Sequence, residues 1–271
     1  MNLSLIIIIT LLPAIAWFFL WRAQDKEKEP YKAMIWCFAL GILASVPFFL
    51  IKTFFPELVE IMNDYLELYL FAFLEEILKA LILVLAIEIS RKWFSQVVDG
   101  LIYGSAVALG FAFAENVFYL SGFLTLDFSF VMVYLVRSIN TMVAHTMFTG
   151  LFGFFYASAY LREEIFHLGK RVKPWSNFWN HFWQSLYFHV TIFHILPNRP
   201  SDKGHYPGSL ILEGILVVSL AHVLFNYLLQ KQINGINIGF LTFPLVFALG
   251  YLCWRLFLQG IYTRIVHKIK A

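Results

Sequence analysis

The sequence has few charged residues. Asp, Glu, Lys and Arg make up 14% of its 271 residues, whereas a typical soluble domain contains about 25%. Apolar residues make up 60% of the chain. This shortage of charge excludes an ordinary soluble globular protein. The small net charge of +3 reflects the loops and gives no reason to expect nucleic-acid binding.

Several other features are scarce or absent. The only two cysteines, Cys37 and Cys253, lie within apolar runs and are typical of buried packing residues, so they leave the redox compartment undecided. The alternation of apolar and polar residues that marks membrane β-strands is missing, which argues against a transmembrane barrel. The chain also lacks low-complexity segments and obvious internal repeats. These absences favour an all-α fold.

Seven apolar runs are long enough to cross a bilayer, which requires about 20 residues in a helix. They predict a polytopic helical membrane bundle that forms one integral membrane domain over residues 1–271. The predicted spans cover about residues 3–21, 33–51, 65–89, 97–120, 130–161, 209–230 and 240–262.

The first apolar run differs from a signal peptide. No Lys or Arg precedes its apolar residues 5–12, and the run continues through Trp21. A signal peptide has a basic N-terminal region followed by a short apolar stretch. We therefore expect residues 3–21 to be a retained first span.

Lys and Arg are distributed unevenly over the loops. Alternate connections at 22–32, 90–96 and 162–208, together with the tail, hold fifteen of the twenty. The opposite side holds only Lys52 and Lys231, and the remaining three lie within spans. The positive-inside rule then predicts an external N-terminus and a cytoplasmic C-terminus.

Two segments outside the spans are predicted to lie on the membrane surface as interfacial helices. One is the acidic stretch 56–64, and the other is residues 177–194, within a cytoplasmic insertion at 162–208 that is rich in Trp and Phe. The histidines of this insertion lack the spacing of a metal site and are predicted to be surface residues: His167, His181, His189, His194 and His205.

The third span contains two adjacent carboxylates and a lysine. A charge at bilayer depth costs a few kcal/mol on insertion scales, so such residues face a protein interior or an aqueous cavity. Glu75 and Lys79 are four residues apart and share a helix face, and Glu76 also reaches Lys79. This motif indicates either an ion pair that locks two helices or a functional site.

Three further spans carry polar side chains. The span 97–120 has small residues at every fourth position, from Gly100 to Gly104 to Ala108, which lets helices approach closely and predicts a central position in the bundle. Residues at steps of three and four place polar groups on one face of the spans 130–161 and 209–230. We expect these side chains to share one polar cavity with Glu75, Glu76 and Lys79: Glu115, Asn116, Arg137, Asn140, His145, His222 and Asn226.

These residue types match the chemistry of peptide hydrolysis. Two imidazoles and a carboxylate form a known catalytic zinc set, which His145, His222 and Glu115 would supply. An unligated carboxylate, Glu75 or Glu76, would act as general base.

The remaining polar groups would support this chemistry. Lys79 would hold one of the two glutamates ionised, and Asn226 or Arg137 would donate to a developing oxyanion. In a metal-free alternative, a glutamate activates water directly while histidine and asparagine hold the water and the oxyanion. The residues leave both mechanisms open.

Four motifs, taken together and in their order along the chain, resemble the PrsW family of intramembrane proteases. That family is similar to the CAAX prenyl proteases and bacteriocin-immunity membrane proteins. The motifs are Glu75-Glu76-x-x-Lys79, Phe111-x-x-x-Glu115-Asn116, His145 in Ala-His-Thr-Met-Phe-x-Gly, and His222-x-x-x-Asn226. The resemblance covers about residues 65–230. The insertion at 162–208 departs from the family pattern. Glu115 also differs from the prenyl proteases, which have a histidine at the corresponding position.

The resemblance implies a multi-span metalloprotease of a bacterial or archaeal cell membrane that cuts a membrane-anchored protein. Its best-known members cut a membrane-spanning anti-sigma factor at the outer side, as a first step of regulated proteolysis. The family's acidic and histidine positions correspond here to five residues: Glu75, Glu76, Glu115, His145 and His222.

Two other classes of protein use intramembrane charges. A proton- or ion-coupled carrier places Glu, Lys and His along a proton relay, but this chain lacks the repeated halves and the broken helices that carriers often show. A non-catalytic binding or immunity protein would keep the scaffold without the chemistry. The full set of polar residues favours an enzyme over both.

Overall fold

The computed structural model describes residues 2–25, 28–55, 57, 64–160, 207–233, 236–237 and 239–270. Nearly all of them are helical, which confirms the predicted all-α fold. Because α6, the π-helix η1 and α7 follow one another without a break, the described residues form seven long helical segments. These are α1 (Leu3–Gln24), α2 (Tyr31–Phe54), α4 (Asp64–Ile89), α5 (Val97–Ser121), α6 (Phe128–Val136) with η1 (Arg137–Thr141) and α7 (Met142–Tyr160), α9 (Pro207–Gln230) and α10 (Thr242–Lys270).

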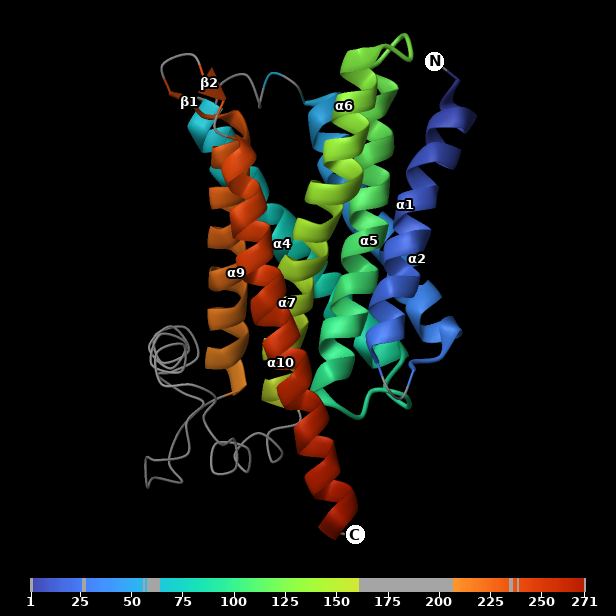
Figure 1. Cartoon of the computed structure of the whole chain (residues 1–271), viewed down its shortest axis with the longest axis vertical. Coiled ribbons are helices and arrows are strands. Elements are labelled where there is room, and N and C mark those ends of the chain that lie inside the picture. Colours follow the sequence, from blue (N-terminus) through green and yellow to red (C-terminus); the bar gives the residue numbers. More distant parts are fainter. Residues whose placement is uncertain are drawn as a thin grey trace.

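The segments run side by side along the long axis of the molecule (Figure 1). The two chain ends lie at opposite ends of this bundle, as an odd number of crossings requires. Among the described residues, five helices are long and apolar enough to cross a membrane: α1, α2, α5, residues 211–230 of α9, and residues 239–256. A short hairpin joins α9 to α10. It consists of the two-residue strands β1 (Gln232–Ile233) and β2 (Ile236–Asn237), and the 3-10 turn η3 (Gly239–Leu241) follows it.

Helix α5 is the central element of the bundle, as the small residues of its sequence predict. Of its most apolar stretch, 89% is buried. A Cβ atom built on Gly153 of α7 would lie 1.9 Å from the carbonyl oxygen of Gly100 in α5, and one on Gly110 of α5 would lie 1.9 Å from the carbonyl oxygen of Phe38 in α2. Helix α5 therefore meets α7 and α2 backbone to backbone, at a separation that only glycine permits.

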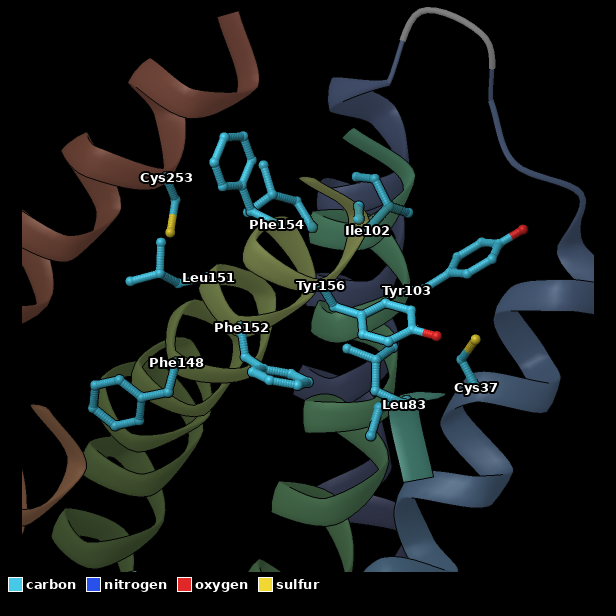
Figure 2. Close-up of a cluster of buried hydrophobic side chains, with 14 of the residues drawn as sticks. Cys37, Leu83, Ile102, Tyr103, Phe148, Leu151, Phe152, Phe154, Tyr156 and Cys253 are labelled. Carbon is cyan, nitrogen blue, oxygen red and sulfur yellow. The ribbon is translucent and has the colours of Figure 1, made fainter. Parts of the chain in front are cut away.

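Large side chains fill the space around α5. Leu83 of α4, Tyr103 of α5, and Phe148 and Phe152 of α7 are almost completely buried within one cluster (Figure 2). The outer surface is also apolar, with more than half of each of these side chains exposed: Leu12, Leu43, Leu81, Leu220 and Phe247. Apolar side chains on the outside as well as the inside are expected of a bundle whose solvent is lipid.

The span predicted at 130–161 is one helical run that contains a π-turn. The backbone N–H of Met142 bonds to the carbonyl of Arg137, five residues earlier, instead of four. The carbonyl of Ser138 accepts a hydrogen bond from the indole Nε1 of Trp17 in α1, at 3.0 Å. The amide Nδ2 of Asn140 donates to the hydroxyl of Thr242 in α10, at 2.7 Å. The π-turn thus ties α7 to both the first and the last helix, and such turns are frequent at functional sites.

Most predicted span boundaries agree with the helices to within a few residues, but α10 continues to Lys270, past the predicted end at 262. The predicted interfacial helix at 177–194, the histidines of the insertion and most of the stretch 56–64 lie outside the described residues. They stay predictions.

Candidate active site

Helix α4 brings three ionisable side chains into the middle of the bundle. Glu75, Glu76 and Lys79 are 4%, 1% and 0% exposed. The ammonium group of Lys79 forms an ion pair with Glu76, three residues earlier on the helix, and its Nζ lies 4.8 Å from the centre of the Phe111 ring. The charge of Lys79 is therefore balanced within α4 by Glu76.

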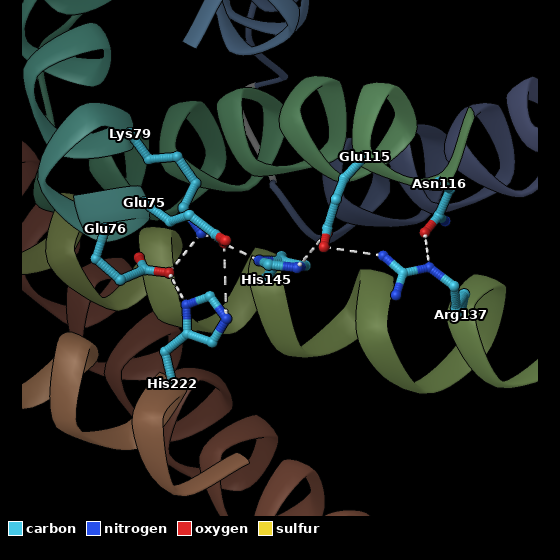
Figure 3. A network of polar contacts seen from close by, with 8 residues as sticks. All are labelled: Glu75, Glu76, Lys79, Glu115, Asn116, Arg137, His145 and His222. Atoms are coloured by element: carbon cyan, nitrogen blue, oxygen red, sulfur yellow. Dashed lines mark hydrogen bonds and ion pairs between the residues drawn. The ribbon is translucent and has the colours of Figure 1, made fainter. Parts of the chain in front are cut away.

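His222 of α9 faces both glutamates of α4 (Figure 3). Its Nδ1 lies 2.8 Å from Oε1 of Glu76, and its Nε2 lies 3.8 Å from Oε2 of Glu75. An ionised carboxylate only accepts hydrogen bonds, so Nδ1 of His222 must be the donor to Glu76. In a neutral imidazole this leaves the lone pair on Nε2, on the side of Glu75.

His145 of α7 is held between two charged partners. Its Nδ1 lies 3.0 Å from Nζ of Lys79, and its Nε2 lies 3.0 Å from Oε2 of Glu115 in α5. Because an ammonium group only donates, Nδ1 of His145 must accept, and Nε2 must carry the proton that is donated to Glu115. Each imidazole is thus oriented by one carboxylate through one nitrogen. The other nitrogen of His222 keeps its lone pair on the side of Glu75, whereas that of His145 accepts from Lys79 and is open to another partner only when Lys79 turns away.

Glu115 is in turn held by a cation at the π-turn. Nη2 of Arg137 lies 3.0 Å from Oε1 of Glu115, and its Nε donates to Oδ1 of Asn116 at 2.7 Å. The guanidinium carbon of Arg137 lies 4.0 Å from the centre of the Tyr119 ring. The polar network therefore extends in one line from Arg137 through Glu115 and His145 to the α4 residues (Figure 3).

Three donors converge at the inner end of this network. One ligand atom each of Glu75, His145 and His222 lie within 4.8 Å of one another. The two imidazole rings have centroids 5.0 Å apart and stand at 88° to each other, and Oε2 of Glu75 is buried without a hydrogen-bond partner. Two imidazoles and a carboxylate form a set that binds divalent metal ions, so these residues fit a metal centre.

A model described as PrsW family intramembrane metalloprotease matches residues 29–252, which is most of the chain. This chain belongs to the PrsW family. Protease PrsW of Clostridioides difficile (strain 630) is 33% identical over 60% of this chain and 68% of that protein. Protease PrsW of Bacillus subtilis (strain 168) is 29% identical over 54% of this chain and 65% of that protein. No solved structure matches the chain.

Membership of the PrsW family confirms the predicted class of enzyme, an intramembrane peptidase, and its location in a membrane.

The convergent donors differ in one carboxylate from the set predicted from the sequence. The prediction combined His145 and His222 with Glu115, whereas the structure brings Glu75 to the two histidines. Arg137 accounts for the difference, because it pairs with Glu115 while Glu115 accepts from His145.

Two predicted site residues, Asn226 as a catalytic and Asn140 as a supporting residue, lie apart from this network. Asn226 is half-buried in α9 and makes no hydrogen bond within the described part of the chain. Asn140 donates to Thr242 and thereby fixes the π-turn to α10.

The sequence interpretation also overlooked the ring of Phe148, which stacks on the ring of His222 with their centroids 5.2 Å apart. Its position three residues after His145, on the same helix face, is the signal that would have revealed it.

Proposed function

We propose that this PrsW-family protein hydrolyses a peptide bond of a membrane-anchored protein at the Glu75–His145–His222 cluster. The supporting observation is the convergence of their ligand atoms within 4.8 Å, with each imidazole oriented by a further carboxylate. Histidine–carboxylate pairs of this kind are the usual support of catalytic metal ligands. As a substrate we propose a membrane-spanning anti-sigma factor of a bacterial cell, cut at its outer side.

The family name implies a metal ion, and we propose Zn²⁺. Glu75, His145 and His222 would hold it, while Glu76 and Glu115 orient the two imidazoles from outside the set. A zinc ion at this place supplies Lewis acidity, which polarises a carbonyl and lowers the pKa of a nearby water. Glu115 remains the alternative carboxylate ligand that the sequence predicts.

The other polar residues have separate roles in this proposal. Glu76 is the carboxylate left beside the donor set, so it accepts the proton of the attacking water and returns it to the leaving amine. Lys79 keeps Glu76 ionised and, at 3.0 Å from Nδ1 of His145, stands where it can donate to a developing oxyanion. Asn226 is a second candidate for that donation.

The proposal is tested in cells that produce wild-type protein or the Glu76→Gln variant. We expect peptides with new N-termini, derived from segments in or next to membrane spans, only with the wild-type protein. The matched control is Glu88→Gln, which removes an exposed carboxylate from the same helix and should give the wild-type pattern. Identical cleavage patterns for Glu76→Gln and wild-type protein would contradict the proposal, and the cleaved protein itself identifies the substrate.

Chelation separates the two hydrolytic mechanisms. We expect a tight chelator to abolish cleavage by the purified protein, because neutral imidazoles and a carboxylate alone are weak activators of water. Stoichiometric Zn²⁺ should restore the activity. Elemental analysis before and after chelation, combined with the cleavage assay, makes the measurement. Full activity in metal-free protein would instead support direct activation of water by Glu75 or Glu76.

The charge distribution also predicts the orientation of the bundle. The end of α1, the start of α2 and the turn between α4 and α5 lie at the end of the bundle where α10 finishes (Figure 1), and the sequence is rich in Lys and Arg at 22–32 and 90–96. Reporter fusions after Ala271 should therefore read cytoplasmic, and fusions at Leu124 or Asn234 should read external. A cytoplasmic signal from Leu124 would overturn the assignment.

A further inference from the structure

A second group of buried carboxylates lies away from the peptidase site. Asp25 follows the end of α1, Glu29 precedes α2, and Asp99 lies in the first turn of α5. They are 5%, 4% and 0% exposed, and one carboxylate oxygen of each lies within 4.8 Å of the other two. Asp99 precedes Glu115 on the same helix by about 24 Å at 1.5 Å per residue. The group is therefore separate from the catalytic chemistry.

Several contacts surround the carboxylate of Glu29. The hydroxyl of Tyr103 donates to Oε2 of Glu29 at 2.6 Å. Arg22 lies nearby, but its Nε donates to the backbone carbonyl of Glu29 at 2.9 Å and its guanidinium carbon lies 3.7 Å from the centre of the Tyr31 ring. These contacts of Arg22 go to a carbonyl and a ring.

A further observation points to a ligand. Oδ2 of Asp99 caps the start of α5 by accepting from the backbone N–H groups of Ser95 and Gln96, at 2.7 and 2.8 Å. Oδ1 of the same carboxylate is buried and has no hydrogen-bond partner. Buried charged oxygens without partners are costly, and coordination of a metal is one of the usual ways to satisfy them. Capping therefore accounts for only one of the two oxygens.

We propose that Asp25, Glu29 and Asp99 bind a hard divalent cation, Mg²⁺ or Ca²⁺. Carboxylate oxygens without sulfur or imidazole are the ligands these ions prefer, and water completes their coordination. The three ligands come from three separate segments of the chain, so the cation joins the end of α1 and the start of α2 to the start of α5. Its effect is on the stability of the bundle, because a ligand that binds only the folded state stabilises it.

The test uses the full chain in nanodiscs and measures thermal unfolding with and without Mg²⁺ or Ca²⁺. We expect millimolar cation to raise the unfolding temperature of the wild-type protein and to leave that of Asp99→Asn unchanged. In this variant the amide oxygen still caps α5 and the amide N–H₂ meets Glu29, so the variant should fold without a cation. His222→Ala, which removes a ligand of the peptidase set, and Glu88→Gln should both keep the wild-type response.

Direct binding provides the second measurement. Tb³⁺ occupies oxygen-lined Ca²⁺ sites and emits when a neighbouring phenol is excited, and Tyr103 is hydrogen-bonded to Glu29. We expect emission from the wild-type and His222→Ala proteins, competition by Ca²⁺ or Mg²⁺, and at least about ten-fold weaker binding by Asp99→Asn. Two results together would overturn the proposal: neither cation changes the unfolding temperature of the wild-type protein, and the Tb³⁺ emission does not depend on Asp99. They would indicate carboxyl groups that share a proton.

Discussion

Glu75→Gln protein is expected to lose both its bound metal and its peptidase activity, whereas Glu115→Gln protein keeps the metal with weaker affinity. Glu75 provides the carboxylate that converges with His145 and His222, and an amide is a poor substitute for a charged ligand. Glu115 contacts His145 from the other side, and loss of such an outer partner lowers metal affinity or activity by about 10–100-fold. Removal of Glu75 should exceed that range.

Three quantities test this prediction: the metal content by elemental analysis, the metal affinity by competition with a chromogenic chelator, and the cleavage rate. The Glu88→Gln variant is the matched control for loss of one carboxylate from α4. Glu75→Gln should stay folded, because the amide keeps the shape of the side chain and removes a buried charge. Glu115→Gln leaves Arg137 without its carboxylate partner and should be less stable, so its thermal unfolding is measured alongside. The reverse order of effects, with metal lost from Glu115→Gln and kept by Glu75→Gln, would restore the ligand set predicted from the sequence.

The second large effect is expected from one added methyl group. Gly153→Ala places a Cβ atom 1.9 Å from the carbonyl oxygen of Gly100, so α7 and α5 must move apart. Overpacking of a core costs about 1–3 kcal/mol and occasionally more, and we expect the upper end because both contacting groups are backbone. Thermal unfolding in nanodiscs should show a strong decrease, accompanied by loss of activity because His145 and Glu115 lie on these two helices.

The control for this experiment is Gly122→Ala. A Cβ atom at Gly122 would have the carbonyl oxygen of Tyr119 as its nearest neighbour, at 3.5 Å, which is an ordinary contact. This variant should unfold close to the wild-type temperature. Equal stability of Gly153→Ala and Gly122→Ala would show that α5 and α7 are not in backbone contact in the membrane.

The sequence predicted the fold class and the residues of the network well, because charge in an apolar run has few explanations. Glu75, Glu76 and Lys79 had to face a protein interior, and the small residues of 97–120 had to meet other helices. Helical spacing along one segment also determined which side chains share a face. These are local properties that any reader of the sequence can evaluate.

The partners across helices were less accessible, because they depend on the rotation and height of each helix relative to its neighbours. Spacing alone allowed Lys79 to pair with either glutamate, and only the packing of α9 and α7 brings Glu76 to both Lys79 and His222. The residue types at 137–141 do not by themselves predict a π-turn. The meeting of Asp25, Glu29 and Asp99 likewise depends on where α5 begins beside the α1–α2 connection.

The backbone contacts of α5 have a mechanical consequence. Helices that touch through glycine cannot slide past each other without a clash, so α2, α5 and α7 form the stiff side of the molecule. The apolar stretch of α9 is 28% buried, compared with 89% for that of α5, so α9 is held less tightly than the central helix. His222 belongs to α9, whereas His145 and Glu115 belong to the stiff side. A movement of α9 away from α7 would therefore change the distance between the two imidazoles, whereas Glu115 and His145 would stay together.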